Sequence, residues 1–404
     1  MIKTVFPSGL YKRKQYLEQI KPFIDQNIIK VITGQRRVGK SYFLFQIIDV
    51  ILKKNKTANI IYINKEDLAF SSIKDAKDLN DYVKKNLKVR KQNYVFIDEI
   101  QEIEAFEDAL RSLLLIKNID LYCTGSNANL LSGDIAGKLS GRSIELKIYS
   151  LSYKEFIEFH NMDDSDKSLD MYLKYGGLPY LKNLPLEDVV VFEYLKNIYT
   201  SIVFRDIINR NHVRNTVFLE QLIFFIADNV GSLFSAKKIS DFLKSQKINL
   251  APNQVQSYLQ FIANAFIIHK VNRYDIIGKR IFEIGEKYYF ENLGLRHSIW
   301  GYRLEDRAKI LENAVYNHLL FKGYKVYVGK INQLEIDFIA EKDNEIAYYQ
   351  VALTINDIKT LNREIKSLEE IPDNYPKTLI TYEAFKGKSI RGIKNIDLST
   401  FLLS

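Results

Sequence analysis

The segment that most constrains the fold is a glycine-rich octet that follows a largely apolar run at residues 28–32. The octet fits the pattern G-x-x-x-x-G-K-[ST], and its members are Gly34, Gln35, Arg36, Arg37, Val38, Gly39, Lys40 and Ser41. Two glycines let the backbone curl so that successive N–H groups point at one anion, and a helix that begins at Lys40 adds its positive end. The octet therefore predicts a phosphate-binding loop between a strand and a helix.

The same pattern predicts the chemistry of individual residues in the loop. Lys40 is expected to reach the β- and γ-phosphates of a nucleotide, and Ser41 is expected to ligate Mg²⁺. Tyr42 follows directly, and we include it with the octet among the nucleotide-binding residues.

A second apolar run, residues 94–97, ends in the acidic pair Asp98 and Glu99. A buried strand of this kind delivers a carboxylate to the nucleotide's Mg²⁺, so Asp98 is predicted to bind with the nucleotide and order the metal. Glu99 lies one residue further on, where a carboxylate activates the attacking water. A solvated helix start is the alternative for an acidic pair after a strand. Together with the loop, the pair favours hydrolysis over storage of a bound nucleotide.

Three more candidates lie next to the third and fourth apolar runs. Ser126 and Asn127 come after residues 119–123, where the strands of open α/β sheets bind ligands, so either side chain is a candidate sensor of the γ-phosphate. A helix N-cap is an equal alternative for both. Arg142, just before a predicted strand at residues 144–148, is the candidate for stabilising charge in the transition state. A surface arginine is the alternative, and the sequence leaves open whether Arg142 acts in its own or a neighbouring chain.

Residues 64–67 match the N-K-x-D pattern that reads guanine in GTPases. That motif should close a strand that comes after the Asp98 strand, whereas this one closes residues 60–63, which precede it. We interpret the segment as a polar strand-to-helix loop and expect ATP as the nucleotide.

Composition is that of a globular protein with several domains. The chain has 404 residues, of which 47% are apolar and 26% charged. The single cysteine, Cys123, excludes a disulfide framework within the chain. Residues 1–7 lack the apolar core of a signal peptide, and no apolar run approaches the roughly 18 residues that span a bilayer, so we expect a cytoplasmic protein without a membrane partner. The five histidines are scattered without the spacing of a zinc site.

Alternating strand and helix patterns over residues 28–149 predict the α/β class, with a parallel sheet covered by helices on both faces. We expect a P-loop ATPase domain at residues 1–150 and a helical lid at residues 151–216. Residues 217–300 have two helical patterns, 236–244 and 253–265, and then a short strand at 266–270. This is the layout of a winged helix, whose second helix enters a major groove.

The winged-helix region carries much of the positive charge. Residues 231–280 hold eight Lys or Arg against two Asp, so 8 − 2 gives +6 of the net +9 of the chain. The eight are Lys237, Lys238, Lys244, Lys247, Lys270, Arg273, Lys279 and Arg280. A basic region predicts duplex DNA as the partner, and a protein contact surface is the alternative.

Residues 301–404 predict a further α/β domain, with a helix at 310–320 and strands at 325–328, 334–340 and 346–353. A helix acid, a strand Asp and then [DE]-x-K on the next strand hold the metal in restriction-endonuclease-like nucleases. Glu312 and Asp337 match, but Gln350 takes the third position and Ala352 the lysine position. We therefore expect a vestigial metal site without cleavage, in which Lys359 or Lys366 is the candidate replacement cation.

Taken together, the segments resemble a widespread prokaryotic family of AAA-type P-loop ATPases that end in a nuclease-like domain. The motifs that carry the resemblance lie at residues 32–41, 96–101, 124–127, 176–179, 288–296, 335–338 and 349–351. The resemblance implies a P-loop ATPase core, a winged-helix middle and a C-terminal domain with the restriction-endonuclease-like fold. It implies no particular substrate.

The leading hypothesis is a Mg²⁺-dependent, ATP-hydrolysing switch or motor that acts on or with DNA. A signalling ATPase that couples nucleotide state to a protein partner is the alternative, and a metal-dependent DNA nuclease is a third hypothesis. The sequence leaves the oligomeric state open.

Overall fold

The computed structural model describes residues 10–131, 137–245, 250–281, 285–355, 357–383 and 389–404. Residues 1–7, used above to exclude a signal peptide, and Lys247 of the basic region lie outside these residues. The chain divides into two compact units, residues 1–149 with 264–266, and residues 150–263 with 267–404. In the described residues, no helix is long and apolar enough to cross a membrane.

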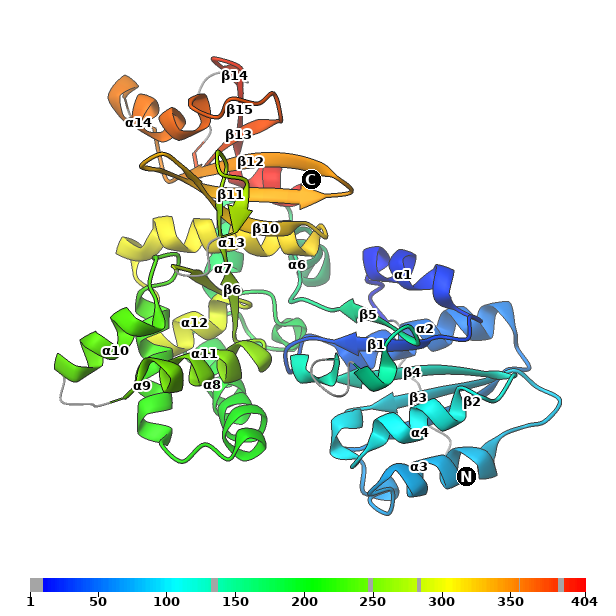
Figure 1. Cartoon of the computed structure of the whole chain (residues 1–404). Helices are drawn as coiled ribbons and strands as arrows, with labels where there is room; N and C mark the ends of the chain where they lie inside the picture. The colour runs from blue at the N-terminus through cyan, green and yellow to red at the C-terminus, as the bar shows by residue number, and fades with distance from the viewer. Residues whose placement is uncertain (1–9, 132–136, 246–249, 282–284, 356, 384–388) are drawn as a thin grey trace. The chain divides into compact units, whose positions relative to one another are not determined.

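The first unit is built on a five-stranded parallel sheet of order β2-β3-β4-β1-β5 (Figure 1). Its strands are β1 (Ile29–Thr33), β2 (Asn59–Asn64), β3 (Asn93–Asp98), β4 (Ile119–Gly125) and β5 (Ser143–Lys147). Its helices are α1 (Lys14–Ile20), α2 (Lys40–Lys54), α3 (Ala76–Asn86) and α4 (Phe106–Leu113), with 3-10 turns η1 (Lys21–Phe23), η2 (Leu68–Phe70), η3 (Ile100–Glu102) and η4 (Ala128–Leu131). The parallel sheet predicted from the alternating pattern is confirmed.

Helices cover both faces of this sheet, as expected for an all-parallel arrangement. One face packs on α3 and α4, where Val95 and Leu121 contribute to a core with Leu79 and Leu110. On the other side of β3 and β4, Phe96 and Tyr122 stack with ring centroids 4.6 Å apart. Alternate residues of the buried strands point to opposite faces, and both faces need apolar side chains. This explains the nearly continuous apolar runs in the sequence.

The second unit begins with helices and contains no described strand before residue 268. The helices are α6 (Tyr153–His160), α7 (Asp166–Tyr175), α8 (Asp188–Ser201), α9 (Thr216–Asp228), α10 (Ala236–Ser245) and α11 (Pro252–Asn264), with the 3-10 turn η5 (Pro179–Asn183) and the π-helix η6 (Ile202–Asn209). Ser152 opens α6 with a capping box that includes Glu155. The helical pattern expected after residue 151 is therefore present.

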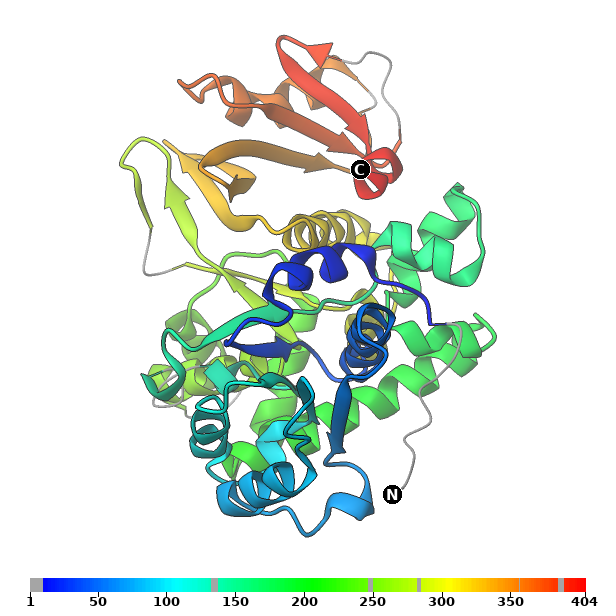
Figure 2. The ribbon, with the colours of Figure 1, turned by 90° about the vertical axis from the view of Figure 1, so that its right-hand side faces the viewer.

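An antiparallel pair and a larger sheet follow the helices. The strand expected at 266–270 is β6 (Ile268–Val271), which pairs with β9 (Lys287–Phe290). Between them, β7 (Arg273–Asp275) and β8 (Arg280–Ile281) form a hairpin, and β7 pairs in parallel with β10 (Lys325–Ile331) (Figure 2). The hairpin is thus the edge of an eight-stranded sheet of order β14-β15-β13-β12-β11-β10-β7-β8.

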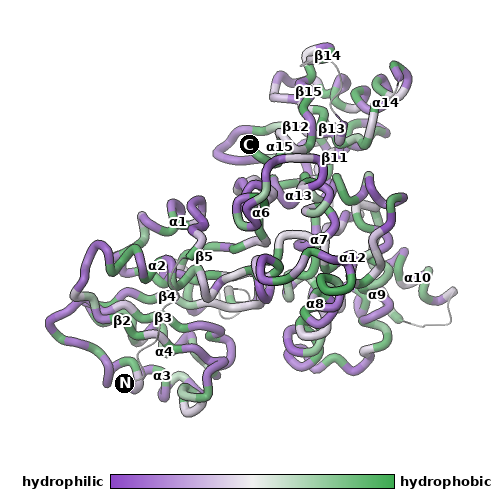
Figure 3. The backbone as a smooth tube through the Cα atoms, turned by 180° about the vertical axis from the view of Figure 1, so that it is seen from behind, coloured by the Kyte–Doolittle hydropathy of each residue, from purple (hydrophilic) through white to green (hydrophobic). Residues whose placement is uncertain are grey.

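The rest of this sheet comes from the C-terminal region. The remaining strands are β11 (Leu334–Lys342), β12 (Glu345–Ala352), β13 (Lys377–Thr381), β14 (Ser389–Ile390) and β15 (Ile393–Asp397). The helices are α12 (Leu293–Trp300), α13 (Arg307–Phe321), α14 (Ile358–Glu369) and α15 (Leu398–Leu403), with the 3-10 turn η7 (Leu304–Asp306). β10, β11 and β12 are antiparallel, and α14 then crosses over to the parallel strand β13. Hydrophobic and hydrophilic residues alternate along α14, whose Leu361, Ile365 and Leu368 are buried (Figure 3).

Candidate active site

The octet forms the connection between β1 and α2, and two glycines give it its shape. Gly39 has φ +98° and Gly34 has φ +149°. A Cβ at Gly34 would lie 2.2 Å from the carbonyl oxygen of Ile148, so the backbone can pass there only without a side chain. Val38 is fully buried and anchors the turn. The backbone of the loop is therefore curled at the N-terminus of a 15-residue helix, as the sequence predicts for an anion site.

Lys40 is buried within this loop. Its Nζ donates to the carbonyl oxygens of Gly34, at 3.0 Å, and Gln35, at 3.1 Å. It also lies 3.9 Å from Oε1 of Glu99. A desolvated ammonium group inside the turn acts strongly on any anion that enters, because the local dielectric is low.

Asp98 and Ser41 meet at the carboxyl end of β3. Oδ2 of Asp98 accepts from the Tyr62 hydroxyl at 3.0 Å, and Oδ1 accepts from the Thr124 hydroxyl. Burial raises the pKa of Asp98, and hydrogen bonds from Thr124, Ser41 and Tyr62 oppose that rise. The carboxylate and the Ser41 hydroxyl are the oxygen ligands that Mg²⁺ takes beside a nucleotide, so the pair fits that ion.

Glu99 stands next to Asp98 in an unusual backbone conformation. Its φ is +55°, a left-handed conformation that costs a non-glycine residue about 1 kcal/mol or more. Its N–H donates to the Thr124 hydroxyl at 3.0 Å, and Ser126 Oγ donates to Glu99 Oε2 at 3.1 Å. Burial acts to raise the pKa of Glu99, but Lys40, Gln101, Arg36 and Ser126 together hold that pKa below its usual value. The carboxylate is therefore ionised at neutral pH, as a general base requires.

Gln101 is a residue that the sequence did not single out. It lies on η3, and its Nε2 donates to Glu99 Oε2 and, at 3.4 Å, to Ser126 Oγ. The only sequence signal was that Gln101 belongs to the motif at residues 96–101. That motif contributed to the family resemblance but did not indicate a function for Gln101. The separation of two residues between Gln101 and Glu99 does not predict their contact, because the direction of the Gln101 side chain depends on the conformation of the turn between them.

Asn127 caps a turn with one atom of its side-chain amide and leaves the other atom unpaired among the described residues. Its Oδ1 accepts from the N–H of Asn129 at 2.8 Å, which caps the turn η4. Its Nδ2 is buried and has no hydrogen-bond partner among the described residues. An unsatisfied buried donor costs about 1–3 kcal/mol, so this group fits a ligand oxygen such as that of a phosphate.

The remaining residues of the predicted set lie around the loop. Arg36 is largely buried and its Nη1 is 3.2 Å from Oε1 of Glu66. Arg37 is exposed and, with φ +71°, adopts the left-handed conformation. Tyr42 is 57% exposed, and its ring meets Phe45 edge-on at 6.0 Å. Glu66 belongs to the N-K-x-D segment, so this segment contacts the loop through an acidic side chain.

Arg142 is placed where it cannot serve the loop of its own chain. It precedes β5, its carbonyl oxygen accepts from Ile29 N–H, and its guanidinium is exposed. The phosphate loop follows the other end of β1, five residues away. At about 3.3 Å per residue, the two lie at opposite edges of the sheet, roughly 16 Å apart. The role predicted for Arg142 is therefore wrong within one chain, because parallel strands place their starts and their ends on opposite edges.

The second set of candidates, in the C-terminal region, also comes together. Glu312 on α13 and Asp337 on β11 flank a buried lysine, Lys287, which comes from β9. Its Nζ lies 2.8 Å from Oε1 of Glu312 and 2.7 Å from Oε1 of Glu335. Neither Lys359 nor Lys366 has this place, so the expected replacement cation was wrong. The sequence could not reveal Lys287, because it lies 50 residues before Asp337 in the chain.

The charged groups in this cluster shift one another's pKa values. Burial acts to lower the pKa of Lys287, but Glu312, Asp337 and Glu335 raise it above its usual value. Burial and the nearby Glu312 raise the pKa of Asp337 well above its usual value. Gln350 Oε1 accepts from the Asp337 N–H at 3.3 Å. Over the described ranges of the chain, no group of three or more His, Cys, Asp or Glu residues is arranged to hold a metal ion.

Comparisons with known proteins bear on both regions. A family profile described as an AAA domain matches residues 26–157, and a profile described as a domain of unknown function matches residues 166–306. An uncharacterised protein of Haemophilus influenzae is 39% identical over 403 residues, which cover 98% of this chain and 99% of that protein. The chain belongs to the family of this protein.

A more distant relative also matches most of the chain. The uncharacterised protein MJ1544 of Methanocaldococcus jannaschii is 30% identical over 379 residues, which cover 88% of this chain and 82% of that protein. Among solved structures, PCH-2 of C. elegans has a TM-score of 0.30 at 12% identity, over 63% of this chain and 69% of that one. A structure of Drosophila ORC bound to AT-rich DNA and Cdc6 has a TM-score of 0.23 at 9% identity, over 70% and 88%.

Proposed function

We propose that the chain is a Mg²⁺-dependent ATPase that works as a switch or motor on or with DNA. The observation that carries the proposal is the convergence of Lys40, Ser41, Asp98 and Glu99 at the carboxyl edge of one parallel sheet, around a glycine-shaped loop. Residues 26–157 match an AAA domain, which supports nucleotide binding as the activity of this edge.

Each residue has a distinct task in the proposed reaction. The loop N–H groups and Lys40 bind and orient the phosphates, and Ser41 with Asp98 holds the metal. Bound Mg²⁺ would neutralise the charge that develops on the phosphate oxygens. Glu99 accepts a proton from the attacking water, and Asn127 offers Nδ2 to the terminal phosphate. Ser126, whose Oγ lies 3.1 Å from Oε2 of Glu99, would respond to the presence of the terminal phosphate at the end of β4.

ATP turnover with two variants tests the ATPase proposal. Lys40→Ala is expected to weaken ATP binding, because the loop loses its cation. Glu99→Gln is expected to bind ATP normally and to hydrolyse it about 100-fold or more slowly, because an amide cannot accept the proton. Nucleotide affinity by fluorescence and phosphate release by a coupled assay separate the two effects. Wild-type turnover in Glu99→Gln would show that Glu99 is not the base.

Contact with DNA is proposed through residues 231–280. On α11, the side chains of Asn253, Gln254, Gln256 and Ser257 are exposed, whereas Val255 and Leu259 are buried. A helix with a polar outer face and basic surroundings suits a major groove. Titration of labelled duplex at two salt concentrations, with ATP turnover measured in parallel, tests the contact, because phosphate binding weakens steeply with salt. Absence of binding at low salt would favour the protein-partner alternative.

The C-terminal region is proposed to be a structural or binding domain without nuclease activity. The ammonium group of Lys287 already pairs with Glu312 and Glu335, and the carboxylate of Asp337 is buried. Plasmid DNA incubated with the protein in Mg²⁺ or Mn²⁺ is therefore expected to stay intact. Cleavage that Asp337→Ala abolishes would overturn this assignment.

A further inference from the structure

The amino edge of the five-stranded sheet, opposite the phosphate loop, carries a row of exposed cations. The row consists of Lys54, Lys56, Lys88, Arg90, Lys91 and Lys117, all exposed, and we call it the basic edge. They lie on the segments that precede β2, β3 and β4, which are adjacent in the sheet. Backbone hydrogen bonds join these segments, from Asn59 N–H to Gln92 O and from Asn93 N–H to Asn118 O, both at 3.0 Å. The cations therefore form one surface.

Little negative charge balances this surface. Residues 24–28, 54–58, 86–92 and 115–118 contain six cations and one acid, Asp25, so their net charge is 6 − 1 = +5. Asp25 pairs with Lys54 at 2.7 Å. The other five cations form no ion pair with any residue that the structure describes. Arg142, at the start of the neighbouring strand β5, extends the row on the side of β1. An uncompensated row of cations attracts a polyanion.

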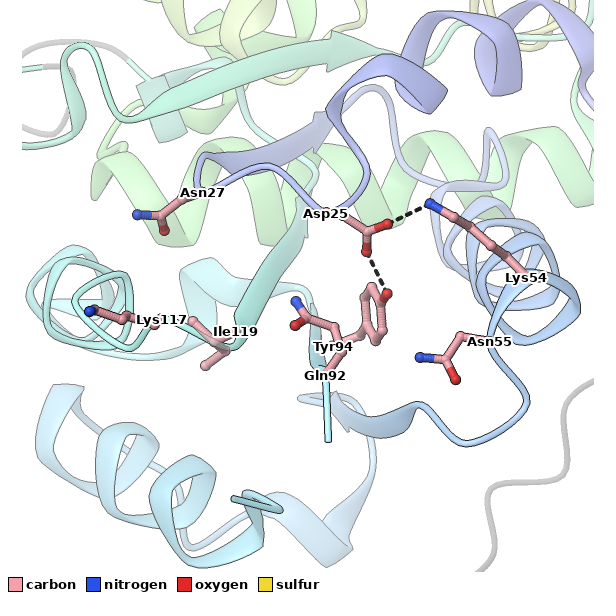
Figure 4. Close-up of a pocket in the computed structure, with 8 residues that line it drawn as sticks. All are labelled: Asp25, Asn27, Lys54, Asn55, Gln92, Tyr94, Lys117 and Ile119. Carbon is pink, nitrogen blue, oxygen red and sulfur yellow. Dashed lines mark hydrogen bonds and ion pairs between the residues drawn. The ribbon is translucent and has the colours of Figure 1, made fainter. Parts of the chain in front are cut away.

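A pocket of about 360 Å³ opens within the basic edge. Figure 4 shows Asp25 on one wall, bound to Lys54 and to the Tyr94 hydroxyl, while Asn27 and Lys117 lie on the other side. The side-chain amides of Asn55 and Gln92 complete the polar lining. Amide and ammonium donors of this kind bind the phosphate and sugar oxygens of nucleic acids.

We propose that the basic edge docks the phosphate backbone of a nucleic acid on the ATPase unit. Strands lie about 4.8 Å apart, so the three segments present cations across roughly 10 Å, which spans neighbouring phosphates of one strand. The amide-lined pocket favours a nucleic acid over a lipid surface, because a flat layer of headgroups cannot enter it. This surface is separate from residues 231–280, and its binding does not depend on theirs or on ATP hydrolysis.

Charge reversal on the basic edge tests the proposal. Full-length wild type and Lys88→Glu/Lys91→Glu are titrated against a labelled single strand of about 30 nucleotides and its duplex, at about 50 and 200 mM salt. The double variant is expected to bind about tenfold or more weakly at low salt. The slope of log affinity against log salt is expected to fall by about 2, one for each lost phosphate contact.

The matched control is Lys74→Glu/Lys77→Glu, which makes the same charge change on exposed residues before and within the start of α3, beyond the carboxyl end of β2. It is expected to bind like wild type. Equal losses in both variants, unchanged binding in Lys88→Glu/Lys91→Glu, or no nucleic-acid binding by wild type would overturn the proposal, as would binding to anionic vesicles alone.

A third variant, Lys237→Glu/Lys238→Glu, tests residues 231–280 separately. Unchanged binding in this variant would count against DNA contact through residues 231–280 and would not affect the proposal for the basic edge. Unchanged ATP turnover and unfolding midpoint show that the variants are folded.

Discussion

At the scale of single residues, the geometry at the carboxyl edge of the parallel sheet depends on side chains that orient other side chains. Glu99 occupies a left-handed backbone conformation, and Thr124 receives its N–H while Ser126 and Gln101 hold its carboxylate. The Oε1 of Gln101 is buried without a partner among the described residues. An unsatisfied buried acceptor lowers the stability of the fold, so stability does not explain why glutamine occupies position 101. We therefore expect that Gln101 serves to position the carboxylate of Glu99.

Replacement of Gln101 with Met tests that role. Met keeps the length of the side chain but donates no hydrogen bond, so Glu99 loses one of its two side-chain donors. The expected result is a kcat about 10-fold or more lower, with KM for ATP unchanged, because the phosphate contacts stay in place. Steady-state kinetics measures both constants. The exposed neighbour Glu102→Gln is the control, and a change in KM alone would contradict the positioning role.

At the scale of secondary structure, the interior strand β1 carries a charge where an apolar residue is the rule. Lys30 is fully buried, and its Nζ bonds to Asp120 on the neighbouring strand β4 and, at 2.7 Å, to Gln26 O. Asp120 also accepts from Asp25 N–H, at 2.9 Å, and from the Tyr122 hydroxyl, at 2.8 Å. Burial lowers the pKa of Lys30 and raises that of Asp120, although each partner opposes the shift of the other. The pair links β1 to β4 within the sheet that carries the phosphate loop.

Substitution of Lys30 with Met is expected to destabilise the first unit by about 3–5 kcal/mol, because Asp120 then remains buried without its cation. The double variant Lys30→Met/Asp120→Leu is expected to recover part of that loss, since no charge is left unpaired. Urea unfolding followed by circular dichroism measures both. A single variant as stable as wild type would mean that the pair contributes little.

At the scale of the whole molecule, Lys287 ties strands and helices that are distant in the chain. It lies on β9 and bonds to Glu312 on α13 and Glu335 on β11, while the Tyr289 hydroxyl donates to Glu312. The hairpin β7–β8 likewise joins the sheet of the C-terminal strands through β10. The helices and ribbon of the second unit are therefore joined to the C-terminal sheet by both charge and backbone pairing.

Loss of this link is expected to be costly. Lys287→Met leaves Glu312 and Glu335 without their buried cation, and we expect a loss of about 3–5 kcal/mol in the stability of the second unit. Lys366→Met, on the exposed face of α14, is the control and should stay within about 0.5 kcal/mol of wild type. Denaturant unfolding with a probe in the second unit, Trp300, provides the measurement. Equal midpoints for the two variants would count against the link.

The parallel sheet, the glycine-shaped loop and the order of elements could be predicted from the sequence, because these depend on local rules: strand and helix periodicity, and the backbone freedom of Gly34 and Gly39. Which distant side chains meet could not be predicted, because it depends on how the whole chain folds. In the structure, Arg142 lies at the edge of the sheet opposite the phosphate loop, Lys287 contacts Glu312, and Gln101 contacts Glu99. Such contacts arise from strand register and helix crossing, which sum many weak interactions over the whole chain, so no short motif encodes them.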